Sequence, residues 1–308
     1  MAGVSYRAWG LLFAFGGAVG FAFRPLLVKL SYAAHPVSPE TLLFLRMALT
    51  LPFFLAVAIW LARRRSTVHT PRPSLTGRDW ATVAGLGFVG YYLASFLDML
   101  GLQYVGAGIG RLIGFLYPTI VVVLSLLFLH KRPNRRELAA LVTCYAGIAL
   151  VVSDQISANP QDRLFLFGVL LCLLNAICYA VYLVAGSQLT LRIGSMRFTA
   201  YTMIAATIPA VVQFVLLETR QSLELPAQVW WYMLMLVTFA TILPVFMVAE
   251  ALKRIGANHF ALIGAVGPVV AVIAGAIGLE EPVTLIQVAG SVLVISGVLL
   301  VSLKPKAA

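Results

Sequence analysis

Six charged residues interrupt the long apolar runs of this sequence, and their side chains are the best placed to bind a charged ligand. They are Arg24, Lys29, Arg46, Asp98, Arg111 and Glu250. A guanidinium can bind a carboxylate through two parallel hydrogen bonds. The three arginines outnumber the one aspartate among them, which predicts surplus positive charge for an anionic group of a substrate. In the alternative interpretation, Asp98 pairs with one arginine and only joins two helices.

Polar and aromatic side chains recur at helical spacing in two apolar segments. Tyr91, Ser95 and Asp98 share one helical face, and Asn175, Tyr179 and Tyr182 share another. Such faces turn away from lipid. They are predicted either to hydrogen-bond neighbouring helices or to line a cavity for a small amphipathic molecule, and the spacing fits both.

Three titratable residues are candidates for proton coupling: Asp98, Glu250 and His259. In the simpler interpretation, Lys253 or Arg254 balances Glu250 at an interface, and His259 lies near the start of a helix.

The sequence predicts no catalytic residues, no metal site and no cofactor. Its four histidines are scattered, and its three cysteines lie in apolar segments without CxxC spacing. An enzyme embedded in a membrane would be expected to cluster such residues.

The composition excludes a water-soluble globular protein. Of 308 residues, 61% are hydrophobic and 11% charged, and the mean hydropathy is +0.96, whereas charged residues make up about a quarter of a soluble protein. Lipid admits only helices or closed barrels, and these long apolar runs lack the alternation of a barrel. The net charge of +11 does not indicate nucleic-acid binding, because the basic residues cluster in short loops.

The expected fold is therefore an all-α integral membrane protein with ten transmembrane helices, each of about 20 residues. The predicted crossings are residues 9–30, 40–62, 80–104, 107–129, 135–153, 164–187, 196–217, 229–252, 257–279 and 283–303. Five fall in an N-terminal half, residues 1–153, and five in a C-terminal half, residues 154–308.

The two halves repeat one another. Residues 101–151 align with 251–301 at a constant offset of 150, without a gap. Because each half has an odd number of helices, the second enters the membrane in the opposite direction, and the repeat is predicted to be inverted. Pro118 and Pro268 occupy equivalent positions and are predicted to kink their helices and to act as hinges.

Lysine and arginine in the loops predict the orientation. Sixteen fall on the side that holds both termini and two, Arg163 and Arg220, on the other, so both termini are predicted to be cytoplasmic. The three membrane arginines and Asp98 then lie at similar depths in the outer half. Lys29 is expected to reach the outer surface, and Glu280 and Glu281 to be solvated at the outer end of a helix.

The repeated motifs carry a family resemblance. They read YVGAGIGRLIGFLYP (104–118) and RIGANHFALIGAVGP (254–268), and the second copy continues with LEEP (279–282) and GSVLVISGVLL (290–300). This pattern resembles the EamA-type ten-helix exporters of the drug/metabolite transporter superfamily and is also similar to their YddG-like amino-acid exporter branch. The resemblance implies two inverted five-helix units around a central cavity. The first copy departs from the pattern with His130-Lys131 where an acidic residue usually ends the helix.

Residues and resemblance together predict a secondary transporter of the bacterial inner (plasma) membrane that exports amino acids or related small metabolites by alternating access. Its expected partners are a small-molecule substrate and the lipid bilayer, with no nucleic acid, and it is expected to act as a monomer. The alternatives are an antiporter of phosphorylated metabolites or nucleotide sugars and, from a different class, a membrane-embedded enzyme.

Overall fold

The computed structural model describes residues 2–63, 75–129, 134–158 and 163–302, and within these ranges all regular structure is helical. The first half contains α1 (Ala2–Ala22), α2 (Arg24–Ala34), α3 (Pro39–Arg63), α4 (Gly77–Gly87), η1 (Phe88–Leu93), α5 (Ala94–Gly101), α6 (Ala107–Gly114), α7 (Tyr117–Leu129) and α8 (Arg135–Ala158). The second contains α9 (Arg163–Ile193), α10 (Ser195–Leu217), η2 (Arg220–Leu223), α11 (Ala227–Val237), η3 (Thr238–Ile242), α12 (Leu243–Gly264), α13 (Val266–Leu279) and α14 (Leu285–Ser302).

Eight helical stretches within the described ranges are long and apolar enough to cross a membrane. They correspond to the first eight predicted crossings. The last two predicted crossings hold the shorter apolar helices Val266–Leu279 and Leu285–Leu300. The ninth predicted crossing is divided because the helix breaks at Ala265. The residues of this crossing that precede the break form the end of α12, which continues from the eighth crossing through a turn at Gly256. Gly256 has φ 73° and ψ 170°, a conformation that glycine adopts without a steric penalty.

Four prolines lie at the points where membrane helices are broken. Pro25, Pro118, Pro244 and Pro268 each fall within the first three residues of a helical segment. Proline has no N–H and its ring clashes with the preceding turn, so it is tolerated at a helix start and interrupts a helix elsewhere. The breaks predicted from Pro118 and Pro268 are therefore present, and so are those that the sequence predicts at Pro25 and Pro244.

Two π-helical segments divide the third and eighth crossings. These are η1, which begins at Phe88, and η3, which begins at Thr238. The two starts are 150 residues apart, the same offset as the sequence repeat. In η3, the hydroxyl of Thr241 donates to the carbonyl of Leu236, five residues back, at 3.0 Å. Single π-turns occur frequently at functional sites.

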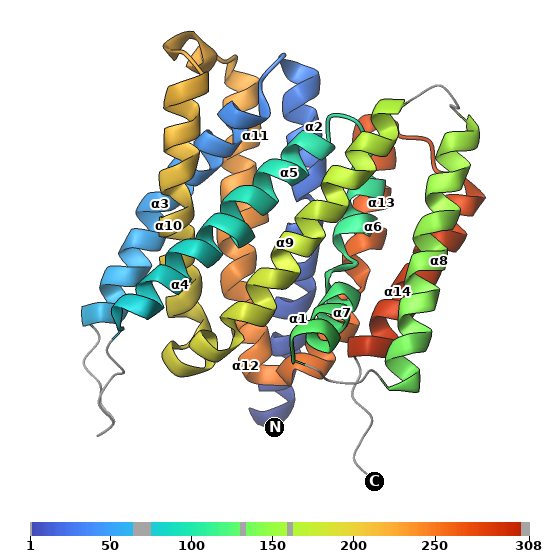
Figure 1. Ribbon diagram of the computed structural model, residues 1–308, viewed down its shortest axis with the longest axis horizontal. Helices are drawn as coiled ribbons and strands as arrows, with labels where there is room; N and C mark the ends of the chain where they lie inside the picture. Colours follow the sequence, from blue (N-terminus) through green and yellow to red (C-terminus); the bar gives the residue numbers. More distant parts are fainter. Residues whose placement is uncertain (1, 64–74, 130–133, 159–162, 303–308) are drawn as a thin grey trace.

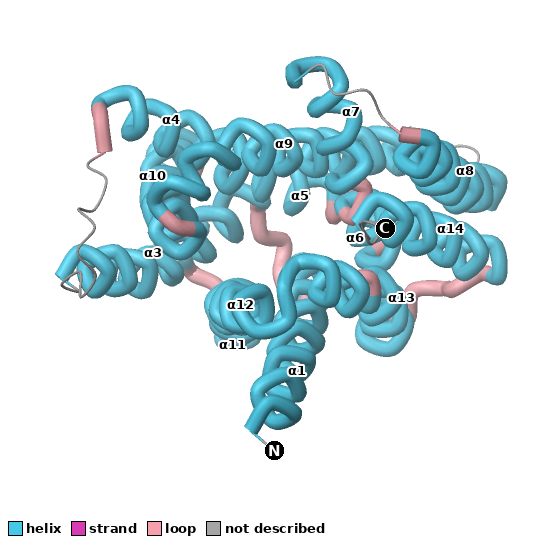
Figure 2. Tube along the Cα trace, turned by 90° about the horizontal axis from the view of Figure 1, so that it is seen from below, coloured by secondary structure: helices cyan, strands magenta, loops and turns pink. Residues whose placement is uncertain are grey.

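The bundle is built from close helix pairs. Seen from below in Figure 2, α1 with α12 and α5 with α9 lie on opposite sides of its middle, and α3 with α10 and α8 with α14 form the two flanks. Small residues allow the closest approach. A Cβ atom on Gly147 of α8 would lie 2.7 Å from the carbonyl oxygen of Gly290 of α14, and the reverse substitution would give the same distance.

The start of α1 and the end of α14 lie at the same end of the bundle, the lower end in Figure 1. The links from α2 to α3 and from α5 to α6 lie at the opposite, upper end.

Candidate functional site

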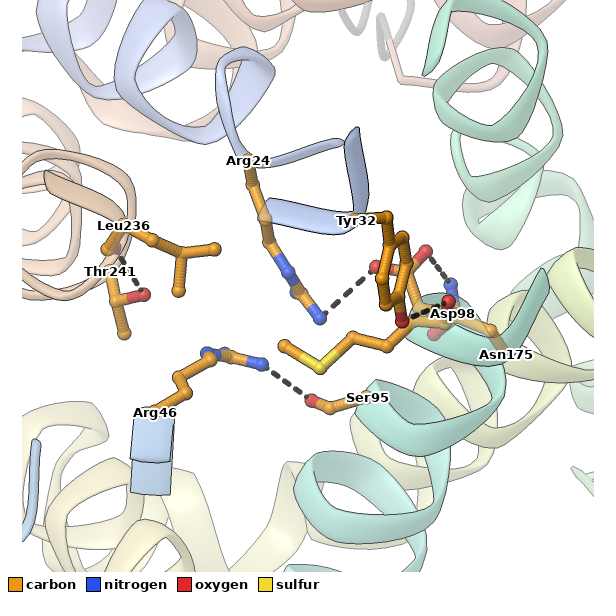
Figure 3. A network of polar contacts seen from close by, with 9 residues as sticks. Arg24, Tyr32, Arg46, Ser95, Asp98, Asn175, Leu236 and Thr241 are labelled. Atoms are coloured by element: carbon orange, nitrogen blue, oxygen red, sulfur yellow. Dashed lines mark hydrogen bonds and ion pairs between the residues drawn. The ribbon is translucent and has the colours of Figure 1, made fainter. Parts of the chain in front are cut away.

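A cavity of about 260 Å³ lies inside the bundle. Eight of the nine side chains that the sequence singles out for binding line it: Arg24, Arg46, Tyr91, Ser95, Asp98, Arg111, Asn175 and Tyr179. They come from α2, α3, η1, α5, α6 and α9, so residues from both halves meet there. Figure 3 shows five of these eight side chains: Arg24, Arg46, Ser95, Asp98 and Asn175. The lining also includes Tyr117, Thr199 and Thr241, which sequence reasoning did not select.

Asp98 of α5 is held by two partners. The Oδ2 atom lies 3.1 Å from Nη2 of Arg24, and Oδ1 accepts a hydrogen bond of 3.0 Å from Nδ2 of Asn175 (Figure 3). Both carboxylate oxygens are therefore engaged, and the contacts join α2, α5 and α9. The helix-joining role that the sequence allowed for Asp98 is present, in the wall of the cavity itself.

Arg46 of α3 has no acidic partner among the described residues. It is 3% exposed, its Nη1 donates to the hydroxyl of Ser95 at 2.8 Å, and its Nε makes no hydrogen bond (Figure 3). A buried charge without a counter-ion is unfavourable. An anion that entered the cavity would supply the missing partner.

Arg111 of α6 has fewer polar partners than Arg46. No hydrogen bond or ion pair of its guanidinium is formed with the described part of the chain, and its Nε is buried. Together with Arg24 and Arg46 it gives the described cavity wall three guanidinium groups against the single carboxylate of Asp98. The surplus positive charge predicted from the sequence is therefore located in one cavity.

Tyrosine rings form one side of the cavity. Tyr117 and Tyr179 meet edge to face with centroids 5.1 Å apart, and Tyr182 lies behind them, 5.9 Å from Tyr179 and 5.1 Å from Tyr91. Tyr182 is 4% exposed and is not part of the lining, so Asn175 and Tyr179 of the predicted face reach the cavity and Tyr182 does not. Beside Tyr182, η1 packs so closely against α9 that the cavity does not extend between them. A Cβ atom on Gly90 would lie 2.4 Å from Cβ of Tyr182.

Polar contacts join α2 to its neighbours at the upper end of the bundle. Nζ of Lys29 donates to the carbonyl of Val105 at 2.8 Å and lies 3.4 Å from Oε1 of Glu281, which also accepts from the backbone N–H of Ala107 at 2.8 Å. Lys29 and Glu281 therefore pair with each other at this end, and their side chains stay partly exposed, at 24% and 20%. The first N–H groups of α6 lack partners within the helix, and a carboxylate at that position satisfies them.

Glu250 and His259 lie near the lower end and do not line the cavity. Oε2 of Glu250 accepts from Nε of Arg254 at 3.1 Å, and Nδ1 of His259 lies 3.0 Å from the carbonyl of Ile255. Nη2 of Arg7 lies 3.1 Å from the other ring nitrogen of His259. Of the three candidates for proton coupling, Asp98 is the one in the cavity wall.

A metal site is not evident in the described residues, which contain no group of three or more histidine, cysteine, aspartate or glutamate side chains. The cavity wall presents guanidinium, carboxylate, amide, hydroxyl and aromatic groups, which can bind and orient ligands.

Comparison with known proteins shows which family this chain resembles. Residues 8–153 and 166–303 match the sequence model of the EamA-like transporter family. The uncharacterized transporter YcbK of Bacillus subtilis is 28% identical over 92% of this chain and 89% of its own length. An uncharacterized transporter of Archaeoglobus fulgidus is 27% identical over 92% of this chain and 94% of its own. A protein crystal structure with 18% sequence identity aligns with a TM-score of 0.63 over 96% of each chain, which shows a shared fold.

Proposed function

Since the chain belongs to the EamA-like transporter family, we propose that it is a secondary transporter that exports amino acids or related small metabolites by alternating access. Family membership makes it a multi-pass membrane transporter. The observation that carries the finer proposal is the central cavity, in which Arg46 and Arg111 present positive charge without acidic partners. A small molecule with a carboxylate would neutralise that charge.

The proposed architecture has ten crossings in two inverted halves, residues 1–153 and 154–308, with both termini in the cytoplasm of a bacterial cell. The packing supports it. Exchanging the halves turns the pair α1 with α12 into the pair α9 with α5, and it leaves the pairs α3 with α10 and α8 with α14 unchanged. The equivalent positions of η1 and η3 agree with the same relation.

Alternating access requires that the cavity open to each side in turn. The contacts of Lys29 and Glu281 support a state closed at the upper end, which the basic loops make the outer end. The third, fourth, eighth and ninth crossings are proposed to move, because η1, η3 and the breaks at Pro118 and Pro268 interrupt them. A helix without a continuous hydrogen-bond ladder bends at lower cost.

The size of the cavity favours small metabolites over nucleotide sugars. Its volume of about 260 Å³ is below the range of about 300–1,000 Å³ that is usual for drug-sized ligands. The relatives named above are described as transporters, which argues against an enzyme.

A reconstituted transport assay tests the proposal. Purified protein in liposomes would be screened for counterflow of labelled amino acids and related carboxylates, at several imposed pH gradients. Arg111→Gln is expected to abolish the transport found, and Arg220→Gln, an exposed residue far from the cavity, to leave it unchanged. Wild-type transport rates in Arg111→Gln at normal folded yield would refute a substrate role for the cavity.

A further inference from the structure

The charged side chains of the cavity wall indicate which ionic groups the substrate carries, whereas the volume of the cavity indicates only how large the substrate is. Resting on the proposed function, we propose that the cavity selects small organic anions without an ammonium group, and that it binds the corresponding zwitterionic amino acids more weakly. The proposed substrate class is thereby narrowed, within amino acids and related small metabolites, to small carboxylates that carry no ammonium group.

No free carboxylate is present for an ammonium group. Asp98 is the single acidic side chain of the described cavity wall. One of its oxygens lies 3.1 Å from Arg24 and the other accepts from Asn175 at 3.0 Å. An ammonium group could reach Asp98 only by displacing one of these partners, and displacing Arg24 would leave a third guanidinium uncompensated.

Arg24 lies beside Asp98, although its Nε and Nη2 make no hydrogen bond, and two further guanidinium groups have no acidic partner in the described wall. Arg46 uses one of its donors on Ser95, and its Nε is buried without a hydrogen bond. Arg111 makes no hydrogen bond in the described structure, and its Nε is buried as well. A carboxylate bound by both would lower the net charge of the three arginines and Asp98 from +2 to +1, whereas an additional ammonium group would return it to +2. Like charges in a site shielded from water repel strongly.

The tyrosine wall does not provide an alternative ammonium site. The face of a tyrosine ring can attract a cation, but Tyr117 and Tyr179 share the cavity wall with Arg111, whose positive charge disfavours a second cation there. Their rings are more suitable for the apolar body of the ligand, together with Phe54 and Phe115 in the same lining.

Pairs of ligands that differ only in the ammonium group test the inference directly. We would measure binding of 3-phenylpropionate against phenylalanine, and of 4-methylpentanoate against leucine, to the purified full-length protein by calorimetry. Each acid is expected to bind at least about tenfold more tightly than its amino acid, which corresponds to about 1.4 kcal/mol. Equal affinities, tighter binding of the amino acids, or no binding of either acid would overturn the inference.

A charge-changing variant provides the second arm. Ser95→Asp places a carboxylate beside Arg46 and is expected to reduce the preference for the acid at least about tenfold. The matched control is Ser95→Asn, which keeps a polar group of similar size without the charge and is expected to retain the preference. The same preference in both variants would contradict the charge argument.

The two proposals fail differently. If the acids bind selectively but show no counterflow in liposomes, the transport proposal fails and the selectivity stands. If neutral amino acids bind as tightly as the acids and are transported, the transport proposal stands and the selectivity is wrong.

Discussion

Lys29 and Glu281 form an ion pair at the N-terminus of α6, with Nζ 3.4 Å from Oε1. Lys29 belongs to the first predicted crossing and Glu281 follows the ninth, so the pair connects the two halves of the chain. The same carboxylate accepts from Ala107 N and occupies the space beside Gly106 and Gly275, where added Cβ atoms would lie 2.9 and 2.7 Å from Oε2. Through these contacts, Glu281 packs against α2, the start of α6 and α13 at the upper end of the bundle.

We expect Glu281→Gln to weaken this closure. The amide keeps a weaker acceptor for Ala107 but loses the charge that attracts Lys29 and the positive end of α6, an effect of about 1–2 kcal/mol. The measurement is the labelling rate of Ser95→Cys, in a background without the native cysteines, by an impermeant thiol reagent added from the outer side. Labelling should become several-fold faster.

Glu280→Gln provides the control, because the neighbouring Glu280 is exposed and forms no side-chain hydrogen bond with the described residues. Its labelling rate should match that of the parent protein. Equal rates in all three proteins would show that the ion pair does not limit access from this side.

We expect Gly90→Ala to destabilise the protein and Gly85→Ala to leave it unchanged. The added methyl at Gly90 would lie 2.4 Å from Cβ of Tyr182, whereas Gly85, also on the third crossing, has no neighbouring atom within 4 Å. Overpacking of this kind costs about 1–3 kcal/mol. Thermal unfolding in detergent would measure it as a lower midpoint for Gly90→Ala. A midpoint at or above that of Gly85→Ala would mean that η1 shifts to make room at little cost.

Much of the cavity wall was predictable because helical spacing determines which side chains share a face. Ser95 and Asp98 follow from this periodicity, as do Asn175 and Tyr179, and the counts of arginine and aspartate predicted the surplus charge. The π-turns were not predictable, because one inserted residue leaves no periodic signal in a uniformly apolar segment. The contact of Glu281 with Ala107 was missed for a different reason: it joins residues from opposite halves, and no local pattern indicates it.

Asp98 and Arg24 should be strongly coupled. Removing one partner of a partly buried ion pair leaves the other charge uncompensated, and for this pair, with side chains 11% and 20% exposed, we expect a loss of about 1–3 kcal/mol in the free energy of unfolding for Asp98→Asn. A double-mutant cycle with Arg24→Gln should recover at least half of that loss. Additive effects of the two substitutions would indicate that the pair contributes little to stability.

Any proton coupling should depend on Asp98. Protonation of this carboxylate would release Arg24 within the cavity, whereas Glu250 and His259 lie outside it. Uptake driven by a pH gradient should therefore be lost in Asp98→Asn while gradient-independent exchange persists. Glu250→Gln and His259→Gln should retain the dependence on the gradient. Its loss in either of these, with Asp98→Asn unaffected, would place the coupling near the lower end instead.

Pro118 and Pro268 are predicted to set the rate of transport and not the affinity for substrate. Both lie just after a break in their helices, at equivalent positions of the repeat, and alanine would allow the hydrogen-bond ladder to re-form and the segments to stiffen. Pro118→Ala and Pro268→Ala should each lower the maximal counterflow rate several-fold and leave binding within about twofold. Pro52→Ala and Pro209→Ala are matched controls, because these prolines lie inside the continuous helices α3 and α10. If all four substitutions slow counterflow equally, the effect belongs to proline in general and the hinge assignment is wrong.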